Sequence, residues 1–257
     1  MDLELAGKTV LVTGASKGIG LAVAKGFAAE GCHLHLTSRT ETDLNAAKGI
    51  IEQSYSVDVQ IHPLDLSKRG SAEKLTAAAG DIDVLVNNAG AIPGGDVLKV
   101  DEGRWREAWD LKVFGYINMT RLYLDKMFER GDGVIVNVTG TAGENPDASY
   151  VAGCAGNASL MAFSKAVGGS SLDKGVRVLA VNPGPVETDR IKTVLRGQAE
   201  AVLGDPERWQ EFTTKWPMGR AAKPVECADL VVFAASARAS YISGVVLTID
   251  GGLGARP

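Results

Sequence analysis

A chain of 257 residues with 45% hydrophobic and 23% charged residues has the composition of an ordinary globular protein. Its net charge of −4 disfavours a nucleic-acid-binding surface, which usually shows clustered lysine and arginine. The three cysteines are too scattered for a disulfide framework or a zinc site. No apolar run approaches the ~20 residues of a membrane span, and the first residues do not resemble a signal peptide. We therefore expect a cytoplasmic protein that binds no nucleic acid, membrane or metal.

Short apolar segments alternate with longer amphipathic segments along the whole chain. Strands are predicted at 9–13, 32–37, 57–62, 84–87, 134–138, 176–182 and 245–249. They are rich in Val, Ile and Leu and lack polar alternation, as strands buried on both faces do. Helices are predicted at 18–30, 41–53, 72–79, 105–128, 150–167 and 224–235. The alternation predicts one α/β domain over 1–257, a three-layer Rossmann fold whose seven-stranded, doubly wound parallel sheet carries helices on both faces.

The least regular stretch is 187–223, which contains Trp209, Phe212 and Trp216. It follows a strand whose carboxyl end faces the expected ligand crevice, so we predict a lid over the substrate. The alternative is a pair of small helices packed on the surface. Three basic residues of this stretch either favour an acidic substrate or form a solvated helix face: Arg190, Lys192 and Arg196.

The segment 13–20 predicts a phosphate-binding turn between the first strand and the first helix. Gly14 permits the tight turn, Gly18 lets the backbone approach phosphate, and Gly20 allows close packing of helix on strand. Free backbone N–H groups and the positive end of the helix dipole then face a pyrophosphate. The residues expected to bind the dinucleotide here are Gly14, Ser16, Lys17, Gly18, Ile19 and Gly20.

The end of the second strand distinguishes the two nicotinamide cofactors. Proteins that prefer NAD usually place Asp or Glu there to bind the ribose hydroxyl groups, whereas this chain has Ser38 and Arg39. The Arg39 guanidinium can hold a 2′-phosphate through two hydrogen bonds, and Lys17 adds a second positive charge. These residues favour NADP over NAD, although each cation taken alone could be an ordinary surface residue.

With these residues in view, the chain resembles the short-chain dehydrogenase/reductase family over nearly its whole length. The resemblance rests on the segments 13–20, 65–66, 87–90, 183–188 and 241–252. It implies further cofactor contacts from Asp65 and Leu66 at the adenine, from Asn87, Ala89 and Gly90 along the cofactor, and from Pro183, Gly184, Val186 and Thr188 around the nicotinamide. It also implies a homotetramer or homodimer built in part on the two long central helices.

The resemblance fails at the catalytic residues. The family uses Asn, Ser, Tyr and Lys, with a Tyr-x-x-x-Lys spacing that lets the lysine lower the pKa of the tyrosine from the same helix face. This chain keeps Tyr150, but Cys154 stands where the lysine is expected. Gly140 occupies the serine position and Lys112 the asparagine position. Three of the four catalytic positions have changed.

Tyr150 can still donate a proton to a carbonyl group, since an unperturbed tyrosine is almost fully neutral at pH 7. We hypothesise that Lys112 is a relocated cation that acts on Tyr150 from the opposite wall of the site. The alternative is that Lys112 only fills space or extends toward solvent. Thr139 or Thr141 could orient the substrate oxygen, or both are ordinary strand-end residues. Cys154 is better explained as a small packing residue than as a nucleophile.

These features predict an NAD(P)-dependent oxidoreductase that uses NADPH to reduce a ketone or aldehyde, with Tyr150 as the proton donor. A second hypothesis is a cofactor-binding sensor or partner subunit without turnover, because the catalytic set is depleted. A third is a non-redox reaction on the same scaffold, which the intact glycine turn disfavours. The sequence does not specify the small-molecule carbonyl or alcohol substrate.

Overall fold

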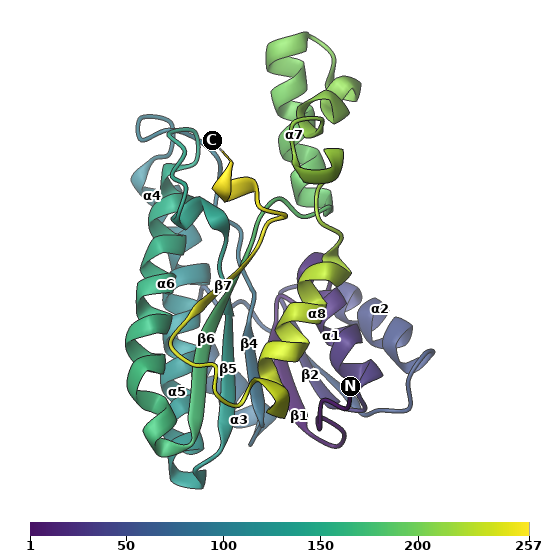
Figure 1. Cartoon of the computed structure of the whole chain (residues 1–257), viewed down its shortest axis with the longest axis vertical. Helices are drawn as coiled ribbons and strands as arrows, with labels where there is room; N and C mark the ends of the chain where they lie inside the picture. Colours follow the sequence, from purple (N-terminus) through teal and green to yellow (C-terminus); the bar gives the residue numbers. More distant parts are fainter. Residues whose placement is uncertain (257) are drawn as a thin grey trace.

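The computed structural model describes residues 1–256 and confirms the predicted fold class (Figure 1). Seven parallel strands form one sheet in the order β3-β2-β1-β4-β5-β6-β7. The strands are β1 (Thr9–Thr13), β2 (His33–Ser38), β3 (Val59–Pro63), β4 (Val84–Asn87), β5 (Gly133–Val138), β6 (Val176–Pro183) and β7 (Val246–Ile249). The strand order reverses direction at β1 and β4, and ligands of such sheets bind in the crevice beyond the carboxyl ends of the strands at this point.

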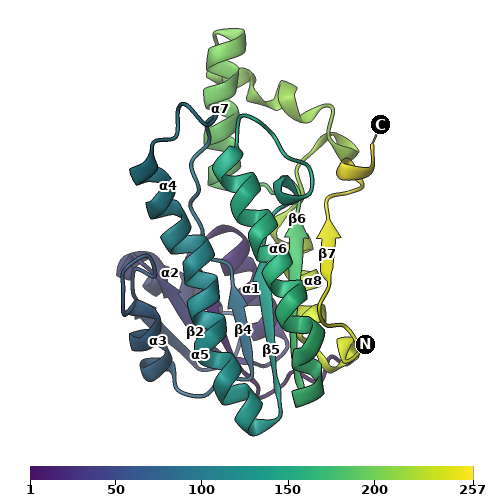
Figure 2. The ribbon, with the colours of Figure 1, turned by 90° about the vertical axis from the view of Figure 1, so that its left-hand side faces the viewer.

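Helices cover both faces of the sheet (Figures 1 and 2). One face carries α1 (Gly18–Ala29), α2 (Glu41–Glu52) and α8 (Pro224–Ala235). The other face carries α3 (Ser71–Ala79), α5 (Gly115–Arg130) and α6 (Val151–Ser171), with α4 (Glu102–Trp109) leading into α5. Val10 and Val12 pack into the core on the first face, while Leu11 packs into the core on the second. This alternation explains why the strands read as continuous apolar runs.

The long helix predicted at 105–128 differs from the structure. It is divided by a π-helical segment, η1 (Asp110–Phe114), between α4 and α5. It also begins earlier, because an Asp101 carboxylate oxygen accepts a hydrogen bond from the Arg104 amide, 2.9 Å away, and caps α4. A π turn leaves no trace in a sequence pattern, and such turns often occur at functional sites.

Two further differences affect the candidate site. Tyr150 precedes α6 as its N-cap instead of lying in its first turn. β5 ends at Val138, and Thr141 begins a short helix, η2 (Thr141–Gly143), so Thr139 and Thr141 do not share a strand face. The glycine at 140, with its extended backbone, separates the two threonines.

The stretch 187–223 contains α7 (Asp189–Leu203) and the short helices η4 (Pro206–Thr213) and η5 (Pro217–Gly219). It projects from the carboxyl end of the sheet (Figures 1 and 2). Leu195 and Ala199 are buried within it, and its three large aromatic residues are half-buried. The role of this segment as a lid over the substrate stays a prediction. Within residues 1–256, no helix has the length and apolarity to cross a membrane.

Candidate active site

The turn between β1 and α1 has the geometry that its glycines predict. Gly14 and Gly18 have φ values of +66° and +59°, which side-chain-bearing residues rarely adopt. A Cβ atom on Gly20 would lie 2.2 Å from the Gly14 carbonyl oxygen, so this position must lack a side chain. Lys17 is the N-cap of α1 and makes no side-chain cap, which leaves the first N–H groups of the helix for a ligand.

Asn88, which the sequence reasoning did not single out, holds this turn in place. Its Nδ2 donates to the carbonyl oxygens of Thr13 and Gly14, at 3.0 and 3.2 Å. The Thr13 hydroxyl in turn accepts hydrogen bonds from the amides of Asn88 and Ala89, at 2.9 and 3.0 Å. The sequence contained one signal for this role of Asn88. Two consecutive asparagines stand at the end of the buried fourth strand, where side-chain amides need polar partners.

The end of β2 is suited to a phosphate group. Arg39 and Lys17 are both exposed, so their charges are available to a ligand. The Ser38 hydroxyl is buried and has no hydrogen-bond partner within the described structure. A buried polar atom without a partner is costly, and a phosphate oxygen beside Arg39 would satisfy it. These residues therefore fit the 2′-phosphate of NADP.

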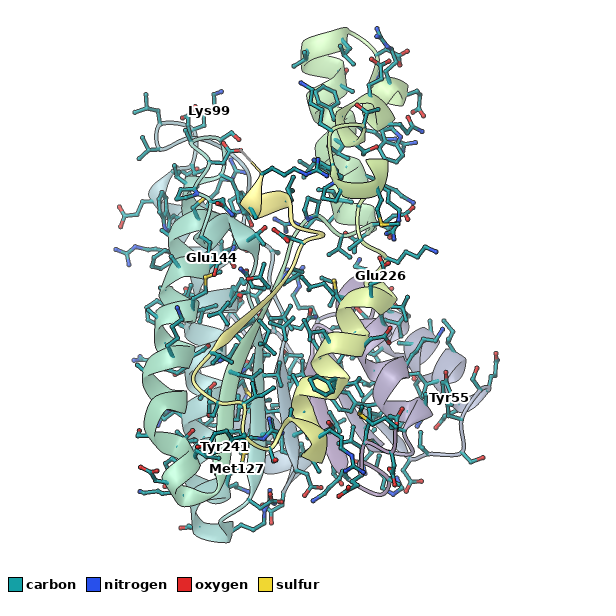
Figure 3. All side chains as sticks on the ribbon, in the orientation of Figure 1. Tyr55, Lys99, Met127, Glu144, Glu226 and Tyr241 are labelled. Carbon is teal, nitrogen blue, oxygen red and sulfur yellow. The ribbon has the colours of Figure 1, made fainter. Side chains whose placement is uncertain are left out.

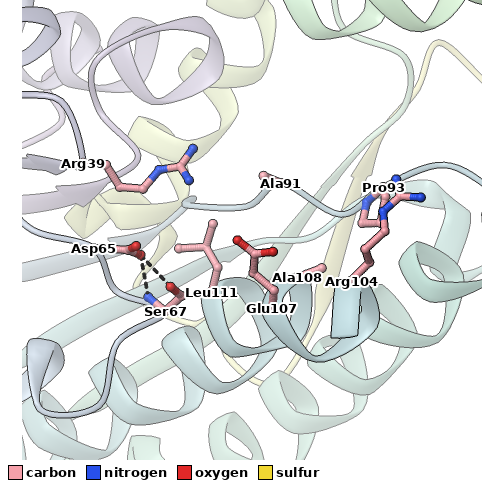
Figure 4. Close-up of a pocket in the computed structure, with 9 residues that line it drawn as sticks. All are labelled: Arg39, Asp65, Ser67, Ala91, Pro93, Arg104, Glu107, Ala108 and Leu111. Carbon is pink, nitrogen blue, oxygen red and sulfur yellow. Dashed lines mark hydrogen bonds between the residues drawn. The ribbon is translucent and has the colours of Figure 1, made fainter. Parts of the chain in front are cut away.

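A cavity of about 190 Å³ continues from this point (Figure 4). It is lined by Arg39, Asp65, Ser67, Ala91, Pro93, Arg104, Glu107, Ala108 and Leu111. Burial would raise the pKa of the Asp65 carboxyl group, but hydrogen bonds from the Ser67 hydroxyl and amide, at 2.7 and 3.0 Å, bring it below its ordinary value. The Leu66 side chain instead packs into the core, so any adenine contact from Leu66 would come from its backbone.

The segment predicted to surround the nicotinamide lies beside the glycine turn. A Cβ atom on Gly18 would lie 3.3 Å from the Thr188 methyl group, and the Thr188 hydroxyl accepts a bond from the Ile191 amide to cap α7. Gly184 is pressed against Asp250, since a Cβ atom there would lie 2.8 Å from the Asp250 Cβ. The rest of this segment is Pro183, which ends β6, and the buried Val186.

Asn87 and Gly90 have supporting roles in the structure. The Asn87 amide is buried and donates to the Asn137 side chain at 2.9 Å. Gly90 makes room for Lys112, because a Cβ atom on Gly90 would lie 2.9 Å from the Lys112 Cδ. The Asn87 contact links β4 to β5 at the carboxyl end of the sheet, where the site lies.

Tyr150 lies at the edge of the crevice. Its ring lies over the first turn of α6, where a Cβ atom on Gly153 would come within 2.1 Å of two ring atoms. Burial raises the pKa of the Tyr150 hydroxyl above its ordinary value. The Arg190 guanidinium opposes this shift through its charge and a hydrogen bond. Tyr150 is therefore neutral over the physiological range and can act as an acid.

Lys112 enters the site from the π turn. Its Nζ donates to the carbonyl oxygen of Thr139 at 3.1 Å, and no hydrogen bond joins Lys112 to Tyr150 among the described residues. Burial, together with the smaller effect of the Arg190 charge, lowers the pKa of Lys112 to about 7. Lys112 thus changes protonation near neutral pH, and its role as the relocated cation stays a hypothesis.

The sequence did not connect Arg190 with Tyr150, although the two side chains are neighbours in the structure. Arg190 extends from the first turn of α7 and donates to the carbonyl oxygen of Ile92, whose side chain packs in the cluster that Tyr150 contacts. One signal was its position in the first turn after the nicotinamide segment. Only the fold shows that this turn reaches across the crevice.

The two candidate hydroxyl groups, those of Thr139 and Thr141, differ in their accessibility to a substrate. The Thr139 hydroxyl is buried and donates to the Val181 carbonyl at 3.2 Å, whereas Thr141 is half-buried and has no side-chain hydrogen bond in the described structure. Thr141 is thus the more accessible hydroxyl group. The Cys154 sulfur contacts the Asp147 backbone, with the amide 3.2 Å away, so Cys154 and Lys112 have different partners. No metal-binding cluster is found among residues 1–256.

The comparisons with known proteins agree with this geometry. Residues 8–199 match the family model for short chain dehydrogenases. The chain belongs to the short-chain dehydrogenase/reductase family. It is 34% identical to the 2-keto-3-deoxy-L-fuconate dehydrogenase of Xanthomonas campestris, over 98% of this chain and 81% of that protein.

Two solved structures of reductases are similar to this one over nearly the whole length. The L-sorbose reductase of Gluconobacter frateurii, complexed with NADPH and L-sorbose, has a TM-score of 0.91 and 29% identity, with both chains covered completely. A variant of actinorhodin polyketide ketoreductase with NADPH has a TM-score of 0.90 and 30% identity, over 97% of this chain and 98% of that one. These similar proteins are named as dehydrogenases and reductases.

Proposed function

We propose that this short-chain dehydrogenase/reductase is an NADPH-dependent carbonyl reductase in which Tyr150 donates the proton. The observation that carries the proposal is the intact glycine turn, which leaves the first N–H groups of α1 uncapped at the carboxyl end of the sheet, the end at which Tyr150 also precedes α6. Similar reductases have been solved with NADPH, which supports the same cofactor here. The partly buried end of β2, with Arg39 and the Ser38 hydroxyl, is suited to its 2′-phosphate.

The cofactor and the protein would each supply one of the two hydrogens added to the carbonyl group. Bound NADPH supplies the hydride that reduces the carbonyl carbon. The Tyr150 hydroxyl transfers its proton to the carbonyl oxygen, so the product is an alcohol and Tyr150 becomes a tyrosinate. Arg190, beside that hydroxyl, stabilises the negative charge that develops on it. The accessible Thr141 hydroxyl donates a hydrogen bond that orients the carbonyl oxygen.

Lys112 supplies the second positive charge. In its protonated form it stabilises the tyrosinate through the field of the site, and it then passes a proton back toward Tyr150 through solvent in the crevice. A pKa of about 7 suits this exchange, because both protonation states are populated at neutral pH. The stretch 187–223 would close over the substrate and exclude bulk water.

The experiment that tests this function separates binding from turnover. NADPH and NADH are titrated by fluorescence, and NADPH consumption is then followed with a panel of ketones and aldehydes. We expect NADPH to bind at least ~10-fold more tightly than NADH, and Arg39→Ala to remove most of that preference. Turnover should be lost in Tyr150→Phe, while NADPH binding is retained.

The sensor or partner-subunit function is the alternative that this experiment addresses. It is supported by Cys154 and Gly140, which stand at the positions of the family's lysine and serine. NADPH binding without consumption across the whole panel and a cell extract would establish it and contradict the reductase proposal. Equal binding of NADH and NADPH would contradict the assignment of the cofactor.

A further inference from the structure

Two cationic side chains of the site, Arg190 beside Tyr150 and Lys112 beside Arg190, have no carboxylate partner. Lys112 donates only to the Thr139 carbonyl oxygen, and its pKa is lowered to about 7 by burial and by the charge of Arg190. Arg190 donates to the Ile92 carbonyl oxygen and lies beside the Tyr150 hydroxyl. Lys112 also packs against Gly90, two residues before Ile92, so the two cations lie close enough to repel one another and to stabilise an anion between them.

The other basic residues of α7 are neutralised. Lys192 pairs with Glu187 at 3.5 Å, and Arg196 pairs with Glu207 at 3.2 Å. None of the ion pairs formed by residues 1–256 includes Arg190 or Lys112. The basic residues on the outer surface of α7 thus have anionic partners from the protein, and the one that reaches into the crevice has none.

Two carboxylates between β5 and α6 have other partners. A Glu144 oxygen accepts hydrogen bonds from the Asn182 amide at 2.9 Å and from the Thr248 hydroxyl at 3.3 Å, at the carboxyl end of the sheet (Figure 3). An Asp147 oxygen accepts from the amide and the hydroxyl of Ser149, each at 2.7 Å. Neither carboxylate forms an ion pair with Arg190 or Lys112, so a ligand can supply the negative charge beside these two cations.

The cofactor does not supply this charge at Tyr150. Its pyrophosphate fits the glycine turn and its 2′-phosphate fits the end of β2, whereas Tyr150 faces the nicotinamide end, which carries no phosphate. Oxidised nicotinamide would add a further positive charge there. The substrate is then the ligand that would bring an anion to Lys112 and Arg190.

We propose that the substrate carries a carboxylate close to its reacting carbonyl group, and that Arg190 and Lys112 bind this carboxylate. The inference rests on the proposed function, since it takes Tyr150 as the group that faces the carbonyl oxygen. The planar guanidinium of Arg190 offers several donors to the two carboxylate oxygens, and Lys112 adds a point charge. Because Arg190 also lies beside the Tyr150 hydroxyl, carboxylate and carbonyl are separated by few bonds, as in a 2-oxo acid.

The proposal has a consequence for protons. A carboxylate beside Lys112 favours the ammonium form and raises the pKa of Lys112 above its value in the free protein. At pH 8 the free side chain is mostly neutral, given a pKa of about 7. Binding of a carboxylate at pH 8 therefore takes up a proton, whereas binding of the matching neutral amide does not.

Equilibrium binding to the complex with NADP⁺ tests the proposal, because the oxidised cofactor cannot reduce an oxo compound. The probes are 2-oxo acids of three to six carbons and their amides, titrated by calorimetry at pH 8 in two buffers of different ionisation enthalpy. We expect the best acid to bind at least ~10-fold more tightly than its amide, with proton uptake. Arg190→Gln should remove most of this preference, Lys112→Met should abolish the proton uptake, and Arg196→Gln, a paired residue of the same helix, should change neither.

Three results would overturn the proposal: no binding of any acid, equal binding of acids and amides, or a preference that survives in both Arg190→Gln and Lys112→Met. The outcome is separable from that of the proposed function. An acid preference without NADPH-dependent reduction leaves the anion site standing and removes the reductase. Should NADP⁺ itself not bind, the same titrations of the cofactor-free protein decide on the anion site.

Discussion

The charge of Lys112 is the residue-scale feature on which the chemistry depends. Its pKa is lowered to about 7, so raising the pH through 7 removes its proton, while Tyr150 keeps its own because burial raises the pKa of that hydroxyl. If the ammonium assists Tyr150, kcat/KM for carbonyl reduction falls as the pH rises above about 7, because kcat/KM reports the groups of the substrate-free enzyme. Measured between pH 5.5 and 9 with saturating NADPH, kcat/KM should show this decline.

Lys112→Met provides the comparison for that profile. It removes the titrating group and leaves a side chain of similar length, so we expect kcat/KM to fall at least ~10-fold at pH 6 and to become nearly independent of pH. NADPH affinity, measured by fluorescence, should change little. Unchanged turnover in Lys112→Met would contradict the hypothesis that Lys112 acts on Tyr150 as a relocated cation, and it would favour the space-filling alternative.

Gly153 determines where the Tyr150 ring lies. An alanine Cβ at this position would come within 2.1 Å of the ring, so Gly153→Ala forces the ring to move. We expect turnover to fall at least ~10-fold while NADPH binding is retained, since misplacing a catalytic group by about 1 Å is enough for such a loss. Gly169→Ala on the same helix, where a Cβ meets nothing within 4 Å, is the control and should keep full activity.

At the scale of elements, α6 is held against the sheet by a close backbone approach. A Cβ atom on Gly168 would lie 2.0 Å from the Val178 carbonyl oxygen on β6 and 2.4 Å from the Gly244 amide. Gly168→Ala should therefore lower the free energy of unfolding by about 3 kcal/mol or more. Gly169→Ala should raise it by about 0.5–1 kcal/mol, the helix-propensity gain. Urea denaturation of the two variants measures both, and equal effects would contradict the close packing.

The same scale shows what local patterns could predict. The strand 9–13 and the helix 224–235 have the bounds predicted from the sequence, because apolar runs and a proline at the first helical position mark them directly. The π turn at Lys112 and the position of Tyr150 ahead of α6 were not predicted. Both depend on contacts with other elements, including the bond from the Trp109 indole to the Ala152 carbonyl at 3.0 Å.

At the scale of the whole molecule, the resemblance to the family implies a homodimer or homotetramer built in part on α5 and α6. Phe114, just before α5, is 50% exposed. Exposure of a phenyl ring to water is unfavourable, and a second chain that covers this ring would remove it from water. We expect light scattering to give two or four times the mass of one chain. Phe114→Glu should lower that mass, and Ile50→Glu on α2, at 44% exposure, should not.

A mass of one chain for the unaltered protein would refute this prediction, as would an equal effect of the two substitutions. The cytoplasmic location likewise stays a prediction, to be checked by fractionating cells that express the tagged chain. The oligomeric state and the cellular location do not depend on the chemistry at Tyr150, so either prediction can be wrong without affecting the proposed function.

The sequence by itself determined the fold class, the glycine turn and the cofactor class, because these depend on local periodicity and on backbone geometry that only glycine permits. Its resemblance to the family also predicts that Cys154, Gly140 and Lys112 stand at three of the family's catalytic positions. Only the tertiary structure decided what surrounds Tyr150. Arg190 is 40 residues further along the chain, and it reaches the site only because α7 starts where β6 ends at the crevice. Burial and the charge of Arg190, which shift the pKa of Lys112, arise from elements that the chain brings together only on folding.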